Sequence, residues 1–278
     1  MIASAPADDR VFAGNRAVGR IALAVGSGST GSRRQRVHEA GSLRVRFPNS
    51  VNKDILEAVI VNTAGGMTGG DRFDVDVTVA AGAQVTVTTA AAEKVYRSTG
   101  PETAVGVKLN VAAGGMLAWL PQQTILFDRV RLRRTIDVDL APGAGIVLAE
   151  AVVFGRAAMG ETVRDGYFFD RWRVRIGGTL VFAESLRLDG AVAAQLAQPS
   201  VARGGIAIAT VLKIPGGESD ADAVRALEKD LVAEASVSAW NGLAVARLAA
   251  PSGEALQRDL VGVLTALGGM PLPRLWLN

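Results

Sequence analysis

The residues of this chain that could carry chemistry are mainly carboxylates, and two of them stand in unusual places. Glu150 and Glu184 each interrupt a strand-like run of apolar residues, IVLAEAVVFG and GTLVFAESLRL. A buried carboxylate is costly unless it is paired or coordinated. These two acids therefore indicate either structural salt bridges, with Arg156 or Arg187 as the facing partners, or a functional polar interior.

The available ligand types limit the chemistry further. The 278 residues include no cysteine and a single histidine, His38. The chain therefore cannot build a thiolate or multi-imidazole site for zinc, nickel or copper from its own residues, nor a cysteine nucleophile or a disulfide. His38 could touch a passing metal, but a lone surface histidine is more often incidental, and we assign no site to it.

The most conspicuous motif is NTAGGMTGGD, residues 62–71. Its paired glycines, Gly65 with Gly66 and Gly69 with Gly70, invite comparison with a phosphate-binding loop. The motif lacks the Gly-Lys-Ser/Thr ending, and an alternating strand pattern follows it rather than a helix. We therefore predict a structural turn that another strand or chain approaches closely, with Asp71 fixed at its exit.

A second motif, AAAEKVYRS, places Glu93 and Lys94 in a small, apolar environment. These residues alone favour a local ion pair on a solvated face. Tyr96 and Arg97 follow directly, and with the four glycines and Gln122 we expect them to form structural or interaction motifs.

A weak internal repeat accompanies these motifs. VAAGAQVTV, VAAGGMLAW and LAPGAGIVL each consist of a strand, a tight glycine turn and a strand, with the turn glycines at 82, 114 and 143. A period near 30 residues would let successive hairpins stack like rungs. The alternative is that small-residue turns look alike in any β protein.

If the repeat is real, the segments after each turn meet in space. The second of these segments, LPQQTILFD, is a strand broken at a proline, with Gln122 and Gln123 where it resumes. Stacking would bring Glu93 and Glu150 towards one polar column with these two amides between them.

The elements that must position these residues are mostly strands. Between residues 43 and 214 the apolar pattern has period two and is punctuated by glycine and proline, which predicts a mainly β, elongated stack of sheets. Two short helices are expected near the C-terminus, over 219–235 and 252–267, with a strand over 243–248 between them.

The domain organisation follows from composition. Residues 1–36 are polar and rich in Gly and Ser, which predicts a flexible N-terminal arm with at most one short strand, over 20–25. Residues 37–278 are expected to form a single domain.

The net charge of +3 is too small to indicate a nucleic-acid-binding protein. The acidic N-terminus and the absence of long apolar runs favour a cytoplasmic protein that enters no membrane.

Six motifs in order, over roughly residues 41–278, resemble the urease accessory protein UreD (UreH) family. They are NTAGGMTGGD, EKVYRS, LPQQTILFD, FGRAAMGE, AESLRL and LPRLW. Two positions depart from the family pattern. Gln123 stands where members commonly have Glu, and Ala149 where they commonly have Trp; the N-terminal segment matches poorly.

The resemblance implies a non-enzymatic scaffold or metallochaperone of mainly β fold. It implies that the chain joins a helical UreF-type partner and a UreG-type GTPase, docks on apo-urease and assists GTP-dependent nickel insertion, with a homodimer within the complex also allowed. No tightly bound cofactor is implied, only nickel in transit. By motif position, the acids of the implied conduit are Asp71, Glu93, Glu150 and Glu184.

Chemistry makes this role plausible, because carboxylates bind divalent ions weakly and release them quickly. Two other functions remain open on the residues alone. A carboxylate-based hydrolase would need two convergent acids in an open cleft. An adhesive β protein would need export, for which the N-terminus shows no signal.

Overall fold

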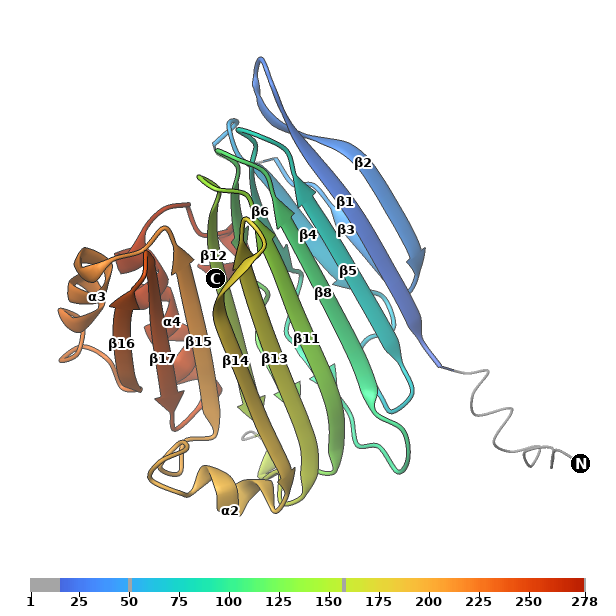
Figure 1. The fold of residues 1–278 in the computed structure, drawn as a ribbon. Coiled ribbons are helices and arrows are strands. Elements are labelled where there is room, and N and C mark those ends of the chain that lie inside the picture. The colour runs from blue at the N-terminus through green and yellow to red at the C-terminus, as the bar shows by residue number, and fades with distance from the viewer. Residues whose placement is uncertain (1–15, 50–51, 157–158, 278) are drawn as a thin grey trace, which may run out of the picture.

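The computed structural model describes residues 16–49, 52–156 and 159–277. These residues form two stacked β-sheets and three α-helices (Figure 1). The predicted mainly β stack is therefore confirmed. None of the described helices has the length and apolar character needed to cross a bilayer.

One sheet has seven strands. In spatial order they are β14 (Thr179–Gly190), β13 (Gly166–Ile176), β11 (Val130–Leu140), β8 (Thr103–Val111), β5 (Arg72–Val79), β1 (Val18–Gly28) and β2 (Gly31–Gly41). The five inner strands run parallel, and the edge strands β14 and β2 each run antiparallel to their neighbour.

The other sheet has ten strands. Eight of them follow the order β16 (Glu234–Trp240), β17 (Leu243–Ala250), β15 (Ala207–Ile214), β12 (Gly145–Phe154), β9 (Met116–Trp119), β6 (Gln84–Thr89), β4 (Leu56–Asn62) and β3 (Leu43–Arg46). Two short strands complete it, because β10 (Thr124–Leu126) pairs with both β12 and β7 (Glu93–Val95).

The repeat is real, and its units connect the sheets. Gly82, Gly114 and Gly143 form the turns that join β5 to β6, β8 to β9 and β11 to β12, with φ values of +69°, +69° and +79°. These turns stack, and the amide of Gly114 donates to the carbonyl of Gly143 at 3.0 Å. The two strands of a unit lie in different sheets, so each unit is an arch rather than the hairpin that we predicted.

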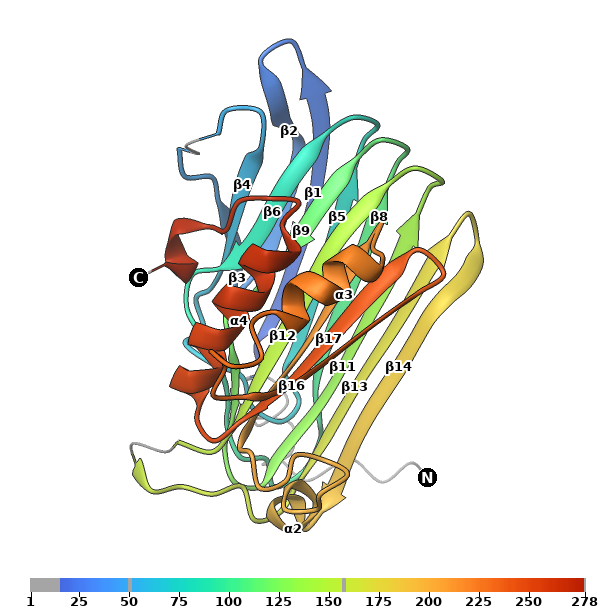
Figure 2. The same ribbon diagram turned by 90° about the vertical axis from the view of Figure 1, so that its left-hand side faces the viewer.

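The core lies between the two sheets, where inward-facing residues of both interdigitate. A second apolar layer covers the outer face of the ten-stranded sheet, beneath α3 (Glu218–Arg225) and α4 (Gly253–Leu267) (Figure 2). Strand β12 has apolar neighbours on both faces and is buried throughout. This explains the continuous apolar run around Glu150.

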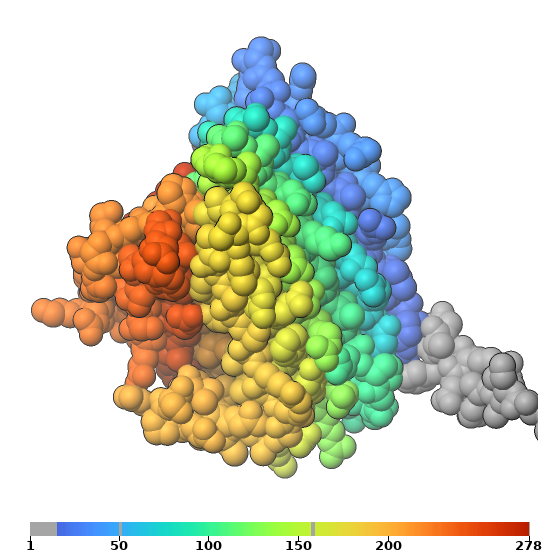
Figure 3. All heavy atoms as spheres, viewed as in Figure 1, coloured from blue at the N-terminus to red at the C-terminus, as the bar shows by residue number. Residues whose placement is uncertain are grey.

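At one side of the stack the sheets end without covering each other. A groove of about 600 Å³ lies between edge strand β14 and strands β15, β16 and β17. It is visible in Figure 3 as the recess between the yellow-orange surface of β14 and the orange-red surface of the C-terminal strands. The short helix α2 (Val192–Leu196) lies on the connection from β14 to β15.

The C-terminal helices differ partly from the prediction. Helix α4 begins after Ser252, whose hydroxyl accepts from the amide of Ala255 at 3.1 Å, and ends at Leu267, as predicted. Helix α3 ends at Arg225, and Glu234 already begins β16. Residues 226–233 form turns and a loop, and only Glu234 and Ala235 of the predicted helix pair with β17.

The predicted arm is corrected for its described part. Residues 18–36 belong to the β1–β2 hairpin, and β1 pairs along its length with β5. Its inward residues Ile21, Leu23 and Val25 are buried, whereas β2 is an exposed edge strand, which explains its polar composition. Residues 1–15 lie outside the described residues. The single domain over 37–278 stays a prediction, and β2 crosses its boundary.

We expect Leu109→Ala to lower the free energy of unfolding by about 2–5 kcal/mol, because Leu109 on β8 is 0 % exposed between the sheets. Lys108→Ala, on the opposite and exposed face of the same strand, should change it by less than about 0.5 kcal/mol. Urea denaturation measures both values, and equal effects would contradict the assigned faces.

Candidate functional site

The predicted polar column forms where three parallel strands meet. Glu93 on β7 lies opposite Thr124 on β10, which lies opposite Val152 on β12. Glu150 is two residues before Val152 and therefore on the same face of β12. Glu93, Gln122 and Glu150 line one cavity of about 80 Å³ between the sheets. The structure thus brings these three sequence-predicted residues together. Gln123, the second amide predicted for the column, instead donates to the carbonyl of Gly253 at 2.7 Å.

Glu93 is a partly buried acid without an ion pair among the described residues. Asn62 Nδ2 donates to its carboxylate at 3.0 Å. Lys94 is exposed and points to the other face of the short strand, so the local ion pair is not formed. Burial raises the pKa of Glu93, and the hydrogen bond from Asn62 lowers it only in part.

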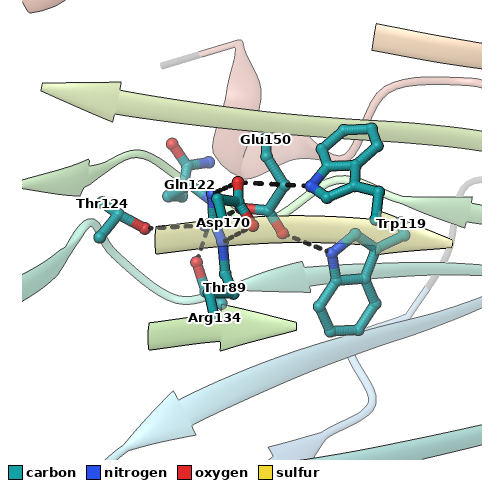
Figure 4. A network of polar contacts seen from close by, with 8 residues as sticks. Thr89, Trp119, Gln122, Thr124, Arg134, Glu150 and Asp170 are labelled. Carbon is teal, nitrogen blue, oxygen red and sulfur yellow. Dashed lines mark hydrogen bonds and ion pairs between the residues drawn. The ribbon is translucent and has the colours of Figure 1, made fainter. Parts of the chain in front are cut away.

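Glu150 belongs to a buried charge network centred on Arg134 (Figure 4). One guanidinium nitrogen of Arg134 contacts Glu150, and the other lies 2.6 Å from Asp170. Two indole N–H groups complete the network: Trp119 donates to Glu150 at 2.9 Å and Trp172 donates to Asp170 at 3.3 Å. The side chains of Arg134 and Glu150 are each 5 % exposed.

Burial affects the pKa values of Arg134 and Glu150 in this network differently. Burial favours the neutral form of Arg134, but the charges of Asp170 and Glu150 outweigh it, so the pKa of Arg134 is raised and the guanidinium stays charged. Burial raises the pKa of Glu150, against the influence of Arg134. The network therefore holds one permanent positive charge between two acids, and each acid also receives an indole hydrogen bond.

The expected partners of Glu150 and Glu184 were wrong. Arg156 pairs with Glu161 at 2.6 Å and Arg187 pairs with Asp189 at 2.7 Å, both near the surface. Both arginines lie close to the two acids in sequence but not in space. In a stack of parallel strands, the facing side chains come instead from the opposite sheet or from the neighbouring strand.

Sequence reasoning missed Arg134 and Asp170, although the strand pattern contains a signal for both. Arg134 is in phase with the buried residues of β11, and Asp170 with those of β13. The parallel pairing of β11 with β13 places the two residues directly opposite each other. Period-two alternation alone therefore identifies them as inward-facing charges.

Glu184 lies at the outer end of the same interior. Its carboxylate contacts Arg247 of β17, and the hydroxyl of Thr210 lies 3.4 Å from it. Glu184 lines a second cavity of about 30 Å³ and also the groove beside β14. It is thus exposed to that groove on one side and to the interior on the other.

Four hollows lined by described residues follow one another through the protein. The two cavities share Arg134 and Glu150, and the second cavity shares Glu184 and Thr210 with the groove beside β14. At the other end, Gln122 lines both the first cavity and a surface groove of about 540 Å³ next to α4. Its side-chain amide donates there to the carbonyl of Leu275 at 3.0 Å.

Asp71 lies apart from these hollows. Its two carboxylate oxygens accept backbone N–H bonds from Ala17 at 2.8 Å and from Thr68 at 2.7 Å. It therefore fixes the exit of the glycine-rich turn, as the turn prediction states, and the structure does not bring it together with the three glutamates.

The glycine-rich turn packs against the second motif. A Cβ on Gly66 would lie 2.4 Å from the Tyr96 ring, and a Cβ on Gly69 would lie 1.9 Å from the Ser98 hydroxyl. Gly65 and Gly70 have φ values of +75° and +90°. The predicted close backbone approach is thus formed within the chain.

Tyr96 and Arg97 hold this contact in place. The Tyr96 hydroxyl donates to the carbonyl of Gly65 at 3.3 Å, and its ring packs edge-on against Phe127 with centroids 5.0 Å apart. The carbonyl of Arg97 accepts from the Thr68 hydroxyl at 3.2 Å, while its side chain is exposed.

Within the described ranges, no group of three or more His, Cys, Asp or Glu side chains could hold a metal ion. Of the acids along the two cavities, Glu150 and Asp170 share Arg134, Glu184 contacts Arg247, and Glu93 has no cationic partner among the described residues. This arrangement can offer a cation single oxygen contacts in succession, but not a closed coordination shell.

Comparisons with known proteins identify the relatives of this chain. The family model of the UreD urease accessory protein matches residues 17–277. The urease accessory protein UreD of Rhodopseudomonas palustris (strain HaA2) is 54% identical over 275 residues, covering 98% of this chain and 97% of that protein. The UreD of Bradyrhizobium diazoefficiens is 50% identical over 268 residues, covering 96% of each chain.

We expect Gly69→Ala to destabilise the protein more than Gly65→Ala does. The added methyl group at position 69 would lie 2.5 Å from the backbone carbonyl of Pro101, which cannot rotate away. At position 65 the added group meets open space, so the cost is only that of a left-handed backbone, about 1–2 kcal/mol. Thermal unfolding compares the two variants, and a reversed order would refute the close-packed turn.

Glu93→Gln should stabilise the protein more at pH 7 than at pH 4. Because the pKa of Glu93 is raised on folding, the wild type loses stability as pH rises from the unfolded pKa, about 4.3, through the folded one. The glutamine variant has no such loss. Urea denaturation at both pH values gives the two differences, and exposed Glu228→Gln is the control; a pH-independent difference for Glu93→Gln would contradict the assignment.

Proposed function

Because the chain belongs to the UreD family of urease accessory proteins, we propose that it assists urease maturation by passing nickel through its interior towards the apo-enzyme. The single observation that carries this proposal is the series of adjoining hollows. Neighbouring hollows share lining residues, and Glu93, Glu150 and Glu184 lie along them in turn.

The ligand chemistry supports transfer rather than storage. A cysteine or histidine cluster would hold nickel tightly, whereas isolated carboxylates exchange it quickly. The chain has no cysteine, and its one histidine lies on exposed strand β2, away from the hollows. We therefore propose nickel in transit and no tightly bound cofactor. Asp71, whose carboxylate serves the glycine-rich turn, is not part of this proposed path.

The finer features of the role are also proposals. In this role the chain is not an enzyme. It works in the cytoplasm with a helical UreF-type partner and a UreG-type GTPase, which hydrolyses GTP while the assembly is docked on apo-urease; a homodimer within that assembly is compatible with the fold. The urease names of the relatives support the setting.

The geometry does not favour the hydrolase alternative. General acid–base work needs two acids that converge on an open cleft. Glu150 and Asp170 are buried around one arginine, and Glu184 contacts Arg247 at the groove. Each of these carboxylates is already paired with an arginine instead of standing free beside a second acid.

Glu93→Gln and Glu184→Gln should lower nickel loading several-fold without preventing assembly with partner proteins. Both substitutions remove a carboxylate from the path at constant size, and neither strands a fully buried arginine. Glu150→Ala is a poorer probe, because removing one partner of buried Arg134 destabilises by about 3–5 kcal/mol.

The measurement is the urease activity and nickel content of urease co-expressed with each variant, together with recovery of the accessory complex by affinity purification. Glu228→Gln, which replaces an exposed acid beyond α3, is the matched control. Normal nickel content with both path variants would refute the conduit.

A further inference from the structure

The two interior cavities adjoin each other within the described part of the chain. Of all their lining residues they have just Arg134 and Glu150 in common. The Arg134 guanidinium therefore lies at the boundary between the cavity of Glu93 and that of Glu184.

Arg134 occupies the position that a cation would take there. Its Nη1 contacts Glu150 from one strand and its Nη2 lies 2.6 Å from Asp170 on another, so the guanidinium bridges the two carboxylates. Its Nε is a further donor to Asp170 at 3.1 Å. The guanidinium is fixed between the two acids by three contacts (Figure 4).

Each of the two carboxylates also accepts an indole N–H, on a separate oxygen in Glu150 and on the oxygen shared with Arg134 Nη2 in Asp170. Trp119 donates to Glu150 Oε1, the oxygen that does not contact Arg134 Nη1, and Trp172 donates to Asp170. If the guanidinium left, each acid would keep its indole donor. Two anchored carboxylates would then face each other without a counter-charge.

The net charge at the two carboxylates depends on whether the arginine or a divalent cation lies between them. With the guanidinium present, two carboxylates and one positive charge leave a net charge of −1. With a divalent cation in its place the same two carboxylates are neutralised, whereas both cations together would leave two like charges in contact in a region of low dielectric. Only one of the two can occupy the junction.

We propose that Arg134 is the gate of the passage: a divalent cation crosses from the first cavity to the second only by displacing the Arg134 guanidinium from Glu150 and Asp170. This rests on the proposed function and adds a control element to it. At rest the gate is closed and the junction binds no metal. Glu93 lines the same cavity as Arg134 and has no cationic partner among the described residues.

The test uses the isolated full-length protein and nickel ions alone. Arg134→Gln removes the gate and leaves both carboxylates, so nickel should raise the melting temperature of this variant by several degrees and leave that of the wild type unchanged. Paramagnetic nickel should also quench tryptophan emission in the variant at concentrations at least tenfold lower than in the wild type, because Trp119 and Trp172 contact the two acids.

Two controls separate the gate from a structural ion pair. Arg171→Gln removes an arginine of the same strand as Asp170 from its pair with Asp137, on the solvent face of the same sheet, and should gain no nickel response. The uncharged triple variant R134Q/E150Q/D170N should also show none. If Arg134 serves only as a structural ion pair, Arg134→Gln should show no nickel response either.

Arg134→Lys keeps the test decisive if Arg134→Gln does not fold. A lysine keeps the charge but cannot bridge both acids with a fixed fork, so nickel should compete with it at concentrations between those for the glutamine variant and the wild type. If every folded Arg134 variant responds to nickel as weakly as the wild type does, the gate is refuted, whatever the urease activation of Glu93→Gln and Glu184→Gln.

Normal urease activation in those two variants would refute the proposed function instead, and it would leave the nickel response of the Arg134 variants unaffected.

Discussion

The polar interior depends on one electrostatic constraint: a permanently charged arginine enclosed between two sheets must have anions around it. Arg134 meets this requirement with Glu150 from the ten-stranded sheet and Asp170 from its own sheet. The network therefore ties the two sheets together at a fixed register, and the positions of Trp119 and Trp172 follow from it. Cavities of about 80 Å³ and 30 Å³ lie on either side of the network.

Much of the fold can be predicted from the sequence because its signals are local. Period-two alternation identifies the strands, and glycines with positive φ mark the stacked turns at residues 82, 114 and 143. What the local pattern does not contain is the partner of each strand. The segment 18–36 is too polar and glycine-rich to indicate a long hairpin, yet β1 is held by its pairing with β5. The last two residues of the predicted helix 219–235 likewise pair with β17 as the start of β16.

The site is predictable to a similar degree. Glu150 and Glu184 can be found because acids in apolar runs are conspicuous, and the 30-residue repeat brings Glu93 and Glu150 to one column. Their arginine partners cannot be found by proximity in sequence, because Arg134 and Arg247 face them from other strands. For Asp71 the sequence predicts a ligand that the structure does not support. Its residue type and motif position fit a ligand, but its two oxygens accept hydrogen bonds from two backbone amides.

The exposed strand β2 has a consequence for self-association. The outer side of an edge strand offers unpaired backbone groups to which another chain could add. Arg33, Arg34 and Arg36 stand on β2, and none of them forms an ion pair with another described residue. Two copies meeting along this strand would bring these like charges together, so fibre-like growth of the seven-stranded sheet is opposed at this end.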